Sequence, residues 1–364
     1  MPSIRAGQVV AFYLFDVAET IDLHAIPARI GGQTVAARLA PKPATPDYVQ
    51  YEKPPLSFDG AAVGIAELDG YQLRCRAYDY GVISLAWWRG FTGDWSELLA
   101  IGQSLIESPE FEQRAEDVCR RVAALLKPAL VGLRDVFLSE DYLVYVVHDL
   151  SQPLTADDLV AKRGDTIATM LRGERQPLSA QEKTKILRHR ISYLTDDLVI
   201  PTWNAAFVYD TPAGAQAALE ILEFANSQLL EFRYYDQLLD NEMASIYARL
   251  QQPKWYENWL GARYTRAARQ VHSLFIDVNE LTDRTENTLK FIGDIYAARL
   301  FALVANRLGL DRWKANIQEK LKTLDDIYGF AVEQSSMSRG QFLELTVVLI
   351  LVLELVLILM GVMK

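Results

Sequence analysis

The last part of the chain is an almost uninterrupted apolar segment. From Phe342 to Met363 it reads FLELTVVLILVLELVLILMGVM, with sixteen Leu, Ile, Val or Phe residues among twenty-two and only two charges. As a helix this segment would rise about 33 Å, enough to cross a hydrocarbon core of about 30 Å. The apolar residues contribute roughly −0.3 to −0.6 kcal/mol each, which outweighs a penalty of about 3 kcal/mol for one central carboxylate. The sequence therefore predicts a transmembrane anchor at residues 341–364.

The two ends of the chain set the expected topology. The apolar run from Val9 to Phe15 is short and is followed by Asp16 and Glu19, so no secretion signal is expected. Only Lys364 follows the anchor. We therefore expect a tail-anchored, single-pass protein with its N-terminal part in the cytosol, in a bacterial inner membrane or an organelle membrane. A fully buried helix in a soluble bundle is the alternative.

The acidic residues of this segment are candidates for assembly. Glu344 lies near the membrane interface, whereas Glu354 lies deep in the predicted span, where a carboxylate usually faces protein or water. One interpretation is a protonated Glu354 that bonds across a helix interface of a homo-oligomer, and the other is a water-filled path. Phe342 and Leu351 complete the predicted membrane and assembly site.

Proline use predicts a long helical region before the anchor. All fourteen prolines lie at or before Pro253, and proline breaks helix interiors. Apolar residues at three- and four-residue spacing then predict helices from about Thr211 to Leu250, from Leu260 to Leu308 and from Asp311 onward. We expect residues 211–340 to form an antiparallel helical stalk.

The sequence of the N-terminal part predicts a mixed α/β head domain at residues 1–150. A mixed connecting segment is expected to follow at residues 151–210. Stretches rich in β-branched and aromatic residues, separated by Gly and Asp, predict strands. They are Gln8–Phe15, Gly60–Leu68, Tyr71–Tyr78, Gly81–Trp88 and Tyr142–His148. With two helices between the last two strands, this order predicts an α+β fold, and a ferredoxin-like arrangement fits it.

The search for chemistry gives no catalytic or cofactor motif. The phosphate-binding, dinucleotide-binding and zinc-protease patterns are missing, and the four histidines are scattered. The two cysteines, Cys75 and Cys119, match no metal or redox spacing and are expected to be reduced. We therefore expect no enzymatic activity, no cofactor and no metal.

Charge limits the partners. The net charge of −10 argues against nucleic acid as a main partner, because phosphate binding needs a basic face. The basic stretch from Lys183 to Arg190 is interpreted as a solvated helix face, with an acidic partner or lipid headgroups as the alternative.

Tryptophans gather at the end of one predicted strand. Trp87, Trp88 and Trp95 lie close together in the sequence. The first interpretation is that they seal one end of the sheet against the following helices. The alternative is a tryptophan exposed to a protein partner.

Two sequence stretches carry a family resemblance. AYDYGVISLAWW at Ala77–Trp88 and SRGQFLELTVVLILVLELVLIL at Ser338–Leu359 resemble the "required for meiotic nuclear division" family. Glu344 and Glu354 match the two acidic positions of that family's terminal segment, whereas Leu345 replaces its usual tryptophan. The resemblance implies a membrane-tethered protein, with mitochondrial members linked to organelle translation, and it implies no enzymatic role.

These observations together predict a tail-anchored scaffold. Such a protein would oligomerise in the bilayer and recruit a protein partner whose identity the sequence does not give. Two alternatives stay open: a membrane-bound enzyme or nucleotide-binding regulator with its site in a cleft of the head, and an oligomeric pore that uses Glu354.

Overall fold

A computed structural model describes most of the N-terminal two thirds of the chain and part of the rest. The described residues are 2–31, 34–36, 54–65, 67–68, 70–106, 108–174, 176–251 and 295–327, with isolated positions after residue 275. The chain divides into two compact units: Met1–Tyr234 with Arg284–Trp313, and Tyr235–Asp283 with Lys314–Lys364. The first unit contains the sheet and the candidate site.

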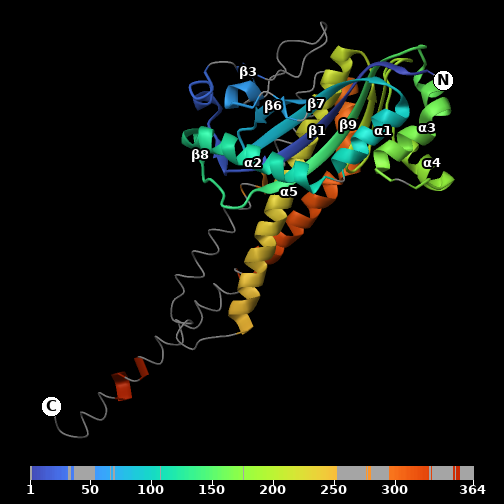
Figure 1. Ribbon diagram of the computed structural model, residues 1–364. Coiled ribbons are helices and arrows are strands. Elements are labelled where there is room, and N and C mark those ends of the chain that lie inside the picture. Colours follow the sequence, from blue (N-terminus) through green and yellow to red (C-terminus); the bar gives the residue numbers. More distant parts are fainter. Residues whose placement is uncertain are drawn as a thin grey trace, which may run out of the picture. The chain divides into compact units, whose positions relative to one another are not determined.

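Nine strands of the described chain form one mixed sheet (Figure 1). Their order is β10-β11-β9-β1-β7-β6-β4-β3, with β5 paired to β6. Neighbouring strands are antiparallel, except that β11 runs parallel to β9. The strands are β1 (Ile4–Asp16), β3 (Thr34–Ala36), β4 (Leu56–Asp59), β5 (Glu67–Leu68), β6 (Tyr71–Ala77), β7 (Val82–Gly93), β9 (Leu138–Leu150), β10 (Leu198–Pro201) and β11 (Ala205–Tyr209). β2 (Thr20–Ile21) and β8 (Leu130–Val131) pair separately.

One face of the sheet has an apolar core. Side chains alternate along a strand, so Val9, Ala11 and Tyr13 of β1 point to this face. They pack with apolar side chains of α1 (Trp95–Ile106), α2 (Pro109–Leu126), α3 (Ala156–Arg172) and α4 (Ala180–Arg188). Ser108, Thr155 and Ser179 cap the N-termini of α2, α3 and α4 by accepting backbone N–H bonds.

Among the described residues, two helices cover the opposite face. These are α5 (Pro212–Gln251), as far as the first unit extends, and α7 (Ile295–Leu308). The rings of Phe224 on α5 and Phe301 on α7 lie 5.7 Å apart between centroids. Short 3-10 helices η1 (Leu23–Ala25), η2 (Gly60–Val63) and η3 (Lys127–Ala129) complete the described elements of this unit.

The predicted fold class is wrong in two respects. A ferredoxin-like head does not account for the sheet, because β10 and β11 lie in the predicted connecting segment and extend the sheet beyond β9. No long antiparallel stalk is found in the described part of residues 211–340 either. The first half of α5 is buried against the sheet, and α7 belongs to the same unit, because their apolar faces pack on the domain itself.

The predicted membrane localisation is also corrected. Within the described ranges, no helix has both the length and the apolar character required to cross a membrane. Phe342, Glu344 and Glu354, together with most of the predicted anchor, lie outside the described residues. Leu351 is described, and its side chain is exposed.

Candidate functional site

α5 carries a row of buried polar side chains. The buried polar residues of its middle part are Glu220, Glu223, Asn226, Ser227, Gln228 and Glu231. Glu220, Glu223 and Ser227 are three and four residues apart, so they lie on the same side of the helix. Because burying a polar group costs free energy unless it is paired, these side chains require partners on the neighbouring elements.

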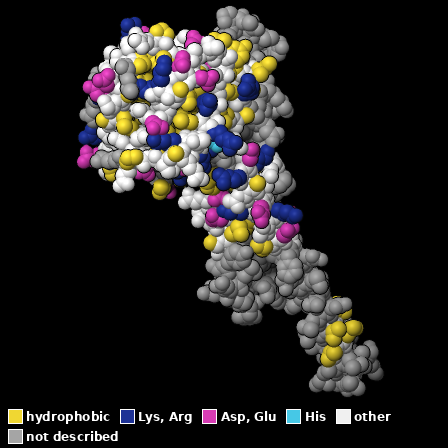
Figure 2. Space-filling model, turned by 90° about the vertical axis from the view of Figure 1, so that its right-hand side faces the viewer, with side chains coloured by type: hydrophobic (Ala, Val, Ile, Leu, Met, Phe, Trp, Pro, Cys, Tyr) yellow, Lys and Arg dark blue, Asp and Glu magenta, His cyan; other side chains and the backbone are white. Residues whose placement is uncertain are grey.

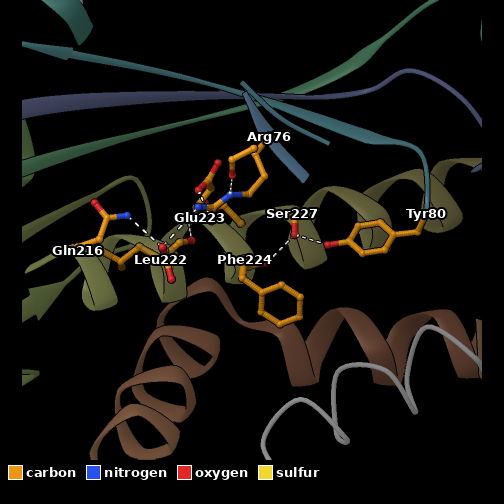
Figure 3. Close-up of polar contacts among 10 residues, drawn as sticks. Arg76, Tyr80, Gln216, Leu222, Glu223, Phe224 and Ser227 are labelled. Atoms are coloured by element: carbon orange, nitrogen blue, oxygen red, sulfur yellow. Dashed lines mark hydrogen bonds and ion pairs between the residues drawn. The ribbon is translucent and has the colours of Figure 1, made fainter. Parts of the chain in front are cut away.

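Arg76 is the main partner of this row (Figure 3). It lies on β6, where Leu73, Cys75 and Ala77 enter the apolar core, and the alternation turns Arg76 to the α5 face. Its Nη1 lies 2.7 Å from Oε2 of Glu223, and its Nε donates to Oγ of Ser57 at 3.0 Å. Arg76 is only 6% exposed, and these two partners satisfy its buried guanidinium on two sides.

Glu220 is the second carboxylate beside Arg76. Its Oε1 is 3.6 Å from Nη2 of Arg76 and accepts a hydrogen bond of 3.0 Å from Nε2 of Gln216. Burial raises the pKa of Glu220, while Arg76 and Gln216 act against this rise. For Arg76, burial lowers the pKa, but Glu223, Tyr78 and Glu220 together outweigh it and leave the pKa raised. Arg76 is therefore always charged and holds two carboxylates beside it.

A pocket of about 110 Å³ opens beside these three charges. Its lining is formed by Gln8, Val10, Phe12, Arg74, Arg76, Ala86, Trp88, Gln216, Leu219, Glu220 and Glu223. The strands β1, β6 and β7 supply one wall, and α5 supplies the other. Arg74 is half-buried, and its positive charge opposes the rise in the pKa of Glu220, although no ion pair or side-chain hydrogen bond joins it to another described residue. Because Glu223 holds Arg76 at 2.7 Å, Arg74 is the less constrained of the two arginines that line the pocket.

Further polar contacts attach α5 to the rest of the unit, among them an ion pair of Arg233 with Glu140 on β9. The hydroxyl groups of Tyr80 and Ser227 are 2.7 Å apart, and both residues are buried (Figure 3). At the end of β1, Oδ2 of Asp16 lies 2.7 Å from Nε of Arg134. The guanidinium carbon of Arg134 in turn lies 3.6 Å from the ring centroid of Tyr234 on α5. Polar groups therefore hold α5 along its packed length.

The tryptophans predicted as a partner surface have different environments. Trp87 is fully buried, and Trp95 is 3% exposed with its Nε1 donating to the carbonyl of Pro2 at 3.0 Å. Neither is available to a partner. Trp88 points to the other face, is half-buried and lines the pocket. Of the three, it is the tryptophan placed to contact a ligand.

The sequence search missed Arg76, Glu220 and Glu223. The sequence does contain a signal for the two glutamates: they lie three residues apart within the otherwise apolar stretch ALEILEFA of α5. Polar residues inside the apolar face of a helix indicate polar partners in the core. Metal binding has no such support, since no cluster of three His, Cys, Asp or Glu residues suited to a metal ion occurs in the described chain.

Comparisons with known proteins were made for the whole sequence. Residues 6–216 match the family model described as "Uncharacterized protein MJ0711, N-terminal domain". The uncharacterized protein MJ0711 of Methanocaldococcus jannaschii is 25% identical over 224 residues, which cover 61% of this chain. The chain spans 66% of the length of that relative. No solved structure matches.

The family match overturns the resemblance to the "required for meiotic nuclear division" family. That resemblance rested on one strand and on the terminal apolar segment, whereas the family match extends from β1 to the start of α5. It covers more than half of the 364 residues. The chain therefore belongs to the family of the uncharacterized protein MJ0711, N-terminal domain.

Proposed function

We propose that the protein is a non-catalytic sensor that binds a small organic carboxylate in the pocket between the sheet and α5. The observation that carries this proposal is Arg74, a second arginine that lines the pocket beside the cluster of Arg76, Glu220 and Glu223 and acts on the charge of Glu220. A guanidinium is planar and forks onto carboxylates, so Arg74 suits this group better than a spherical anion.

The rest of the pocket supports a ligand with an apolar body. Phe12 and Leu219 are buried apolar wall residues, and Trp88 adds an aromatic surface. The amides of Gln8 and Gln216 can donate or accept hydrogen bonds at its rim. A few polar groups placed in an apolar wall are typical of sites that bind small molecules.

Binding in this pocket would act on α5. Glu220 and Glu223 belong to α5 and also line the pocket, so a bound ligand contacts the helix and the sheet together. A ligand that binds only the packed state stabilises that state by mass action, by about 2.7 kcal/mol at a hundred times its Kd. The output of the sensor would be a tighter attachment of α5.

Benzoate is a suitable probe, and benzamide is its neutral control. We expect benzoate to raise the Tm of the full-length protein and to slow hydrogen exchange in the α5 segment 216–223, while benzamide does neither. Arg74→Ala should weaken benzoate binding at least tenfold in calorimetric titration. Arg29→Ala, a change at an exposed arginine that does not line the pocket, should leave it intact. Equal binding of benzamide, or unchanged binding by Arg74→Ala, would refute the proposal.

We infer a second candidate function, the recruitment of a protein partner, from exposed apolar side chains. Leu125, Val131, Leu133 and Val136 are 40–79% exposed within twelve residues of the chain. Exposed apolar patches on soluble units often mark contacts between proteins. The partner proposed here is a second copy of the chain, and light scattering tests it. Val136→Asp should shift an oligomer toward the monomer, and a wild-type monomer at all concentrations would exclude this candidate.

A further inference from the structure

A second, separate surface of the first unit gathers positive charge. α4 ends at Arg188, and Ile191 just after it pairs with Val199 of β10. α7 packs on β10 and carries Arg307. The fold therefore brings the C-terminal ends of α4 and α7 to the same edge of the sheet. Figure 2 shows Lys and Arg side chains near a histidine side chain on the face that carries α3 and α4.

The positive charges in this group are balanced only loosely by described carboxylates: Nζ of Lys185 lies 3.9 Å from Oε2 of Glu182. Burial lowers the pKa of His189, and the positive charges of Arg307, Arg188 and Lys185 lie close enough to lower it further. The Nε of Arg307 is buried and has no hydrogen-bond partner among the described residues. Arg190 has only a loose ion pair, 3.7 Å from the exposed Asp157, and such pairs contribute little. This edge is therefore cationic although the whole chain carries a net charge of −10.

Exposed aromatic side chains flank the same edge. Trp203, in the turn between β10 and β11, is 58% exposed. The hydroxyl of Tyr142 donates to the carbonyl groups of Thr202 and Ala205 on both sides of Trp203, and Arg307 is near enough to act on the pKa of Tyr142. Trp203 thus lies beside the cationic group.

The second aromatic residue sits on a fixed loop. Tyr193 is also 58% exposed, and its ring centroid is 5.5 Å from that of Tyr296 on α7. The buried carboxylate of Asp197 accepts the backbone N–H groups of Tyr193 and Leu194 at 2.6 and 2.8 Å. Side chains on a fixed loop lose little entropy when they bind a ligand.

We propose that this edge, formed by Lys185, Arg188, Arg190, Tyr193, Trp203 and Arg307, binds a short stretch of single-stranded nucleic acid. Cationic side chains contact backbone phosphates, and protruding aromatic rings stack on bases, which is how single strands are bound without sequence preference. A whole-chain net charge excludes a large basic face but not a local one. The aromatic residues protrude on separate loops rather than lining a groove, which favours bases over an acidic peptide helix.

The test is the binding of a fluorescently labelled octauridylate to the full-length protein, measured by anisotropy at several salt concentrations. With three or four phosphates contacted, the slope of log K against log salt should be about −2 to −3. Trp203→Ala should weaken binding about tenfold, because one stacked base contributes about 1–3 kcal/mol. Arg188→Ala should weaken binding and reduce the slope by about 0.7. Both residues are exposed, and Arg29→Ala at another exposed arginine serves as the matched control.

Each outcome decides the proposal. Selective loss of binding in Trp203→Ala and Arg188→Ala, with Arg29→Ala unchanged, supports it. Absence of binding at low salt, or equal binding by all three variants, overturns it. An octaglutamate peptide that binds more tightly than octauridylate also overturns it and identifies the partner as an acidic protein segment.

Discussion

Removal of the charge of Glu223 is the most direct test of the buried network between α5 and the sheet. The side chains of Arg76 and Glu223 are 7% and 6% exposed, and their nearest atoms are 2.7 Å apart. Taking one partner from a buried ion pair typically costs about 3–5 kcal/mol, because the other charge stays buried. Glu220 remains 3.6 Å from Arg76. We therefore expect Glu223→Gln to lower the free energy of unfolding by about 3 kcal/mol, the lower end of this range.

The assay is urea denaturation of the full-length protein at pH 7. The free energies of unfolding of wild type and variant are compared with the same m-value for both. Glu116→Gln is the matched control. Glu116 and Arg120 on α2 are as close, at 2.6 Å, but their side chains are 42% and 46% exposed. An exposed pair at this spacing contributes about 0.3–0.5 kcal/mol. If both glutamate changes have the same small effect, burial does not give the Arg76 network its strength and the reasoning fails.

A double-mutant cycle separates the pair from other effects of the substitution. Arg76→Met should destabilise the protein on its own, because it leaves Glu220 and Glu223 buried without their cation. The double variant of Arg76→Met with Glu223→Gln should lose about 2 kcal/mol less than the sum of the single losses. Additive losses would show that the two side chains do not interact.

Two further predictions concern the pH dependence and the backbone. Burial raises the pKa of Asp16 from 3.8 to about 6, against the opposing effect of Arg134. The stability from protonated Asp16 is complete well below pH 3.8 and is lost as the pH rises through 6, so wild type should lose about 2 kcal/mol relative to Asp16→Asn between pH 4 and 7. Parallel denaturation profiles of the two proteins would contradict this. Gly81 has a φ of +96°, and a Cβ there would collide with the carbonyl oxygen of Ala18, so Gly81→Ala should cost about 3 kcal/mol or more. Gly64→Ala, at a φ of +76° with open space around it, should cost only about 1–2 kcal/mol in the same melts; equal costs would exclude the collision.

The strands of the sheet were predictable where the local signal is strong. The predicted strands Gln8–Phe15 and Gly81–Trp88 lie within or overlap β1 and β7, because β-branched and aromatic runs suit a sheet buried on both faces. The helix predicted from about Thr211 to Leu250 matches α5, whose first residue is Pro212, since proline fits the first helical turn. By contrast, the predicted strand Gly60–Leu68 is divided into η2 and β5.

The packing of α5 was not predictable from its own sequence. Its apolar spacing is compatible with a free-standing stalk as well as with a helix on a sheet. The contacts that decide between them, such as Tyr80 with Ser227, join residues 147 positions apart. The partner of Glu223 is likewise on β6, far away in the sequence. Periodicity identifies which side of a helix is buried, but it does not identify the surface that buries it.

The two faces of the sheet separate stability from function. The face under α1 to α4 packs into a continuous apolar core. Burial of this apolar surface stabilises the fold in proportion to its area. The face under α5 instead buries Arg76, Glu220 and Glu223, although apolar replacements of such groups are often neutral or stabilising. A charged cluster in that position is therefore poorly explained by stability alone. In the function that we propose, the cluster has a role that an apolar core could not supply: with Arg74 it forms a charged wall that fixes the orientation of a ligand between the helix and the sheet.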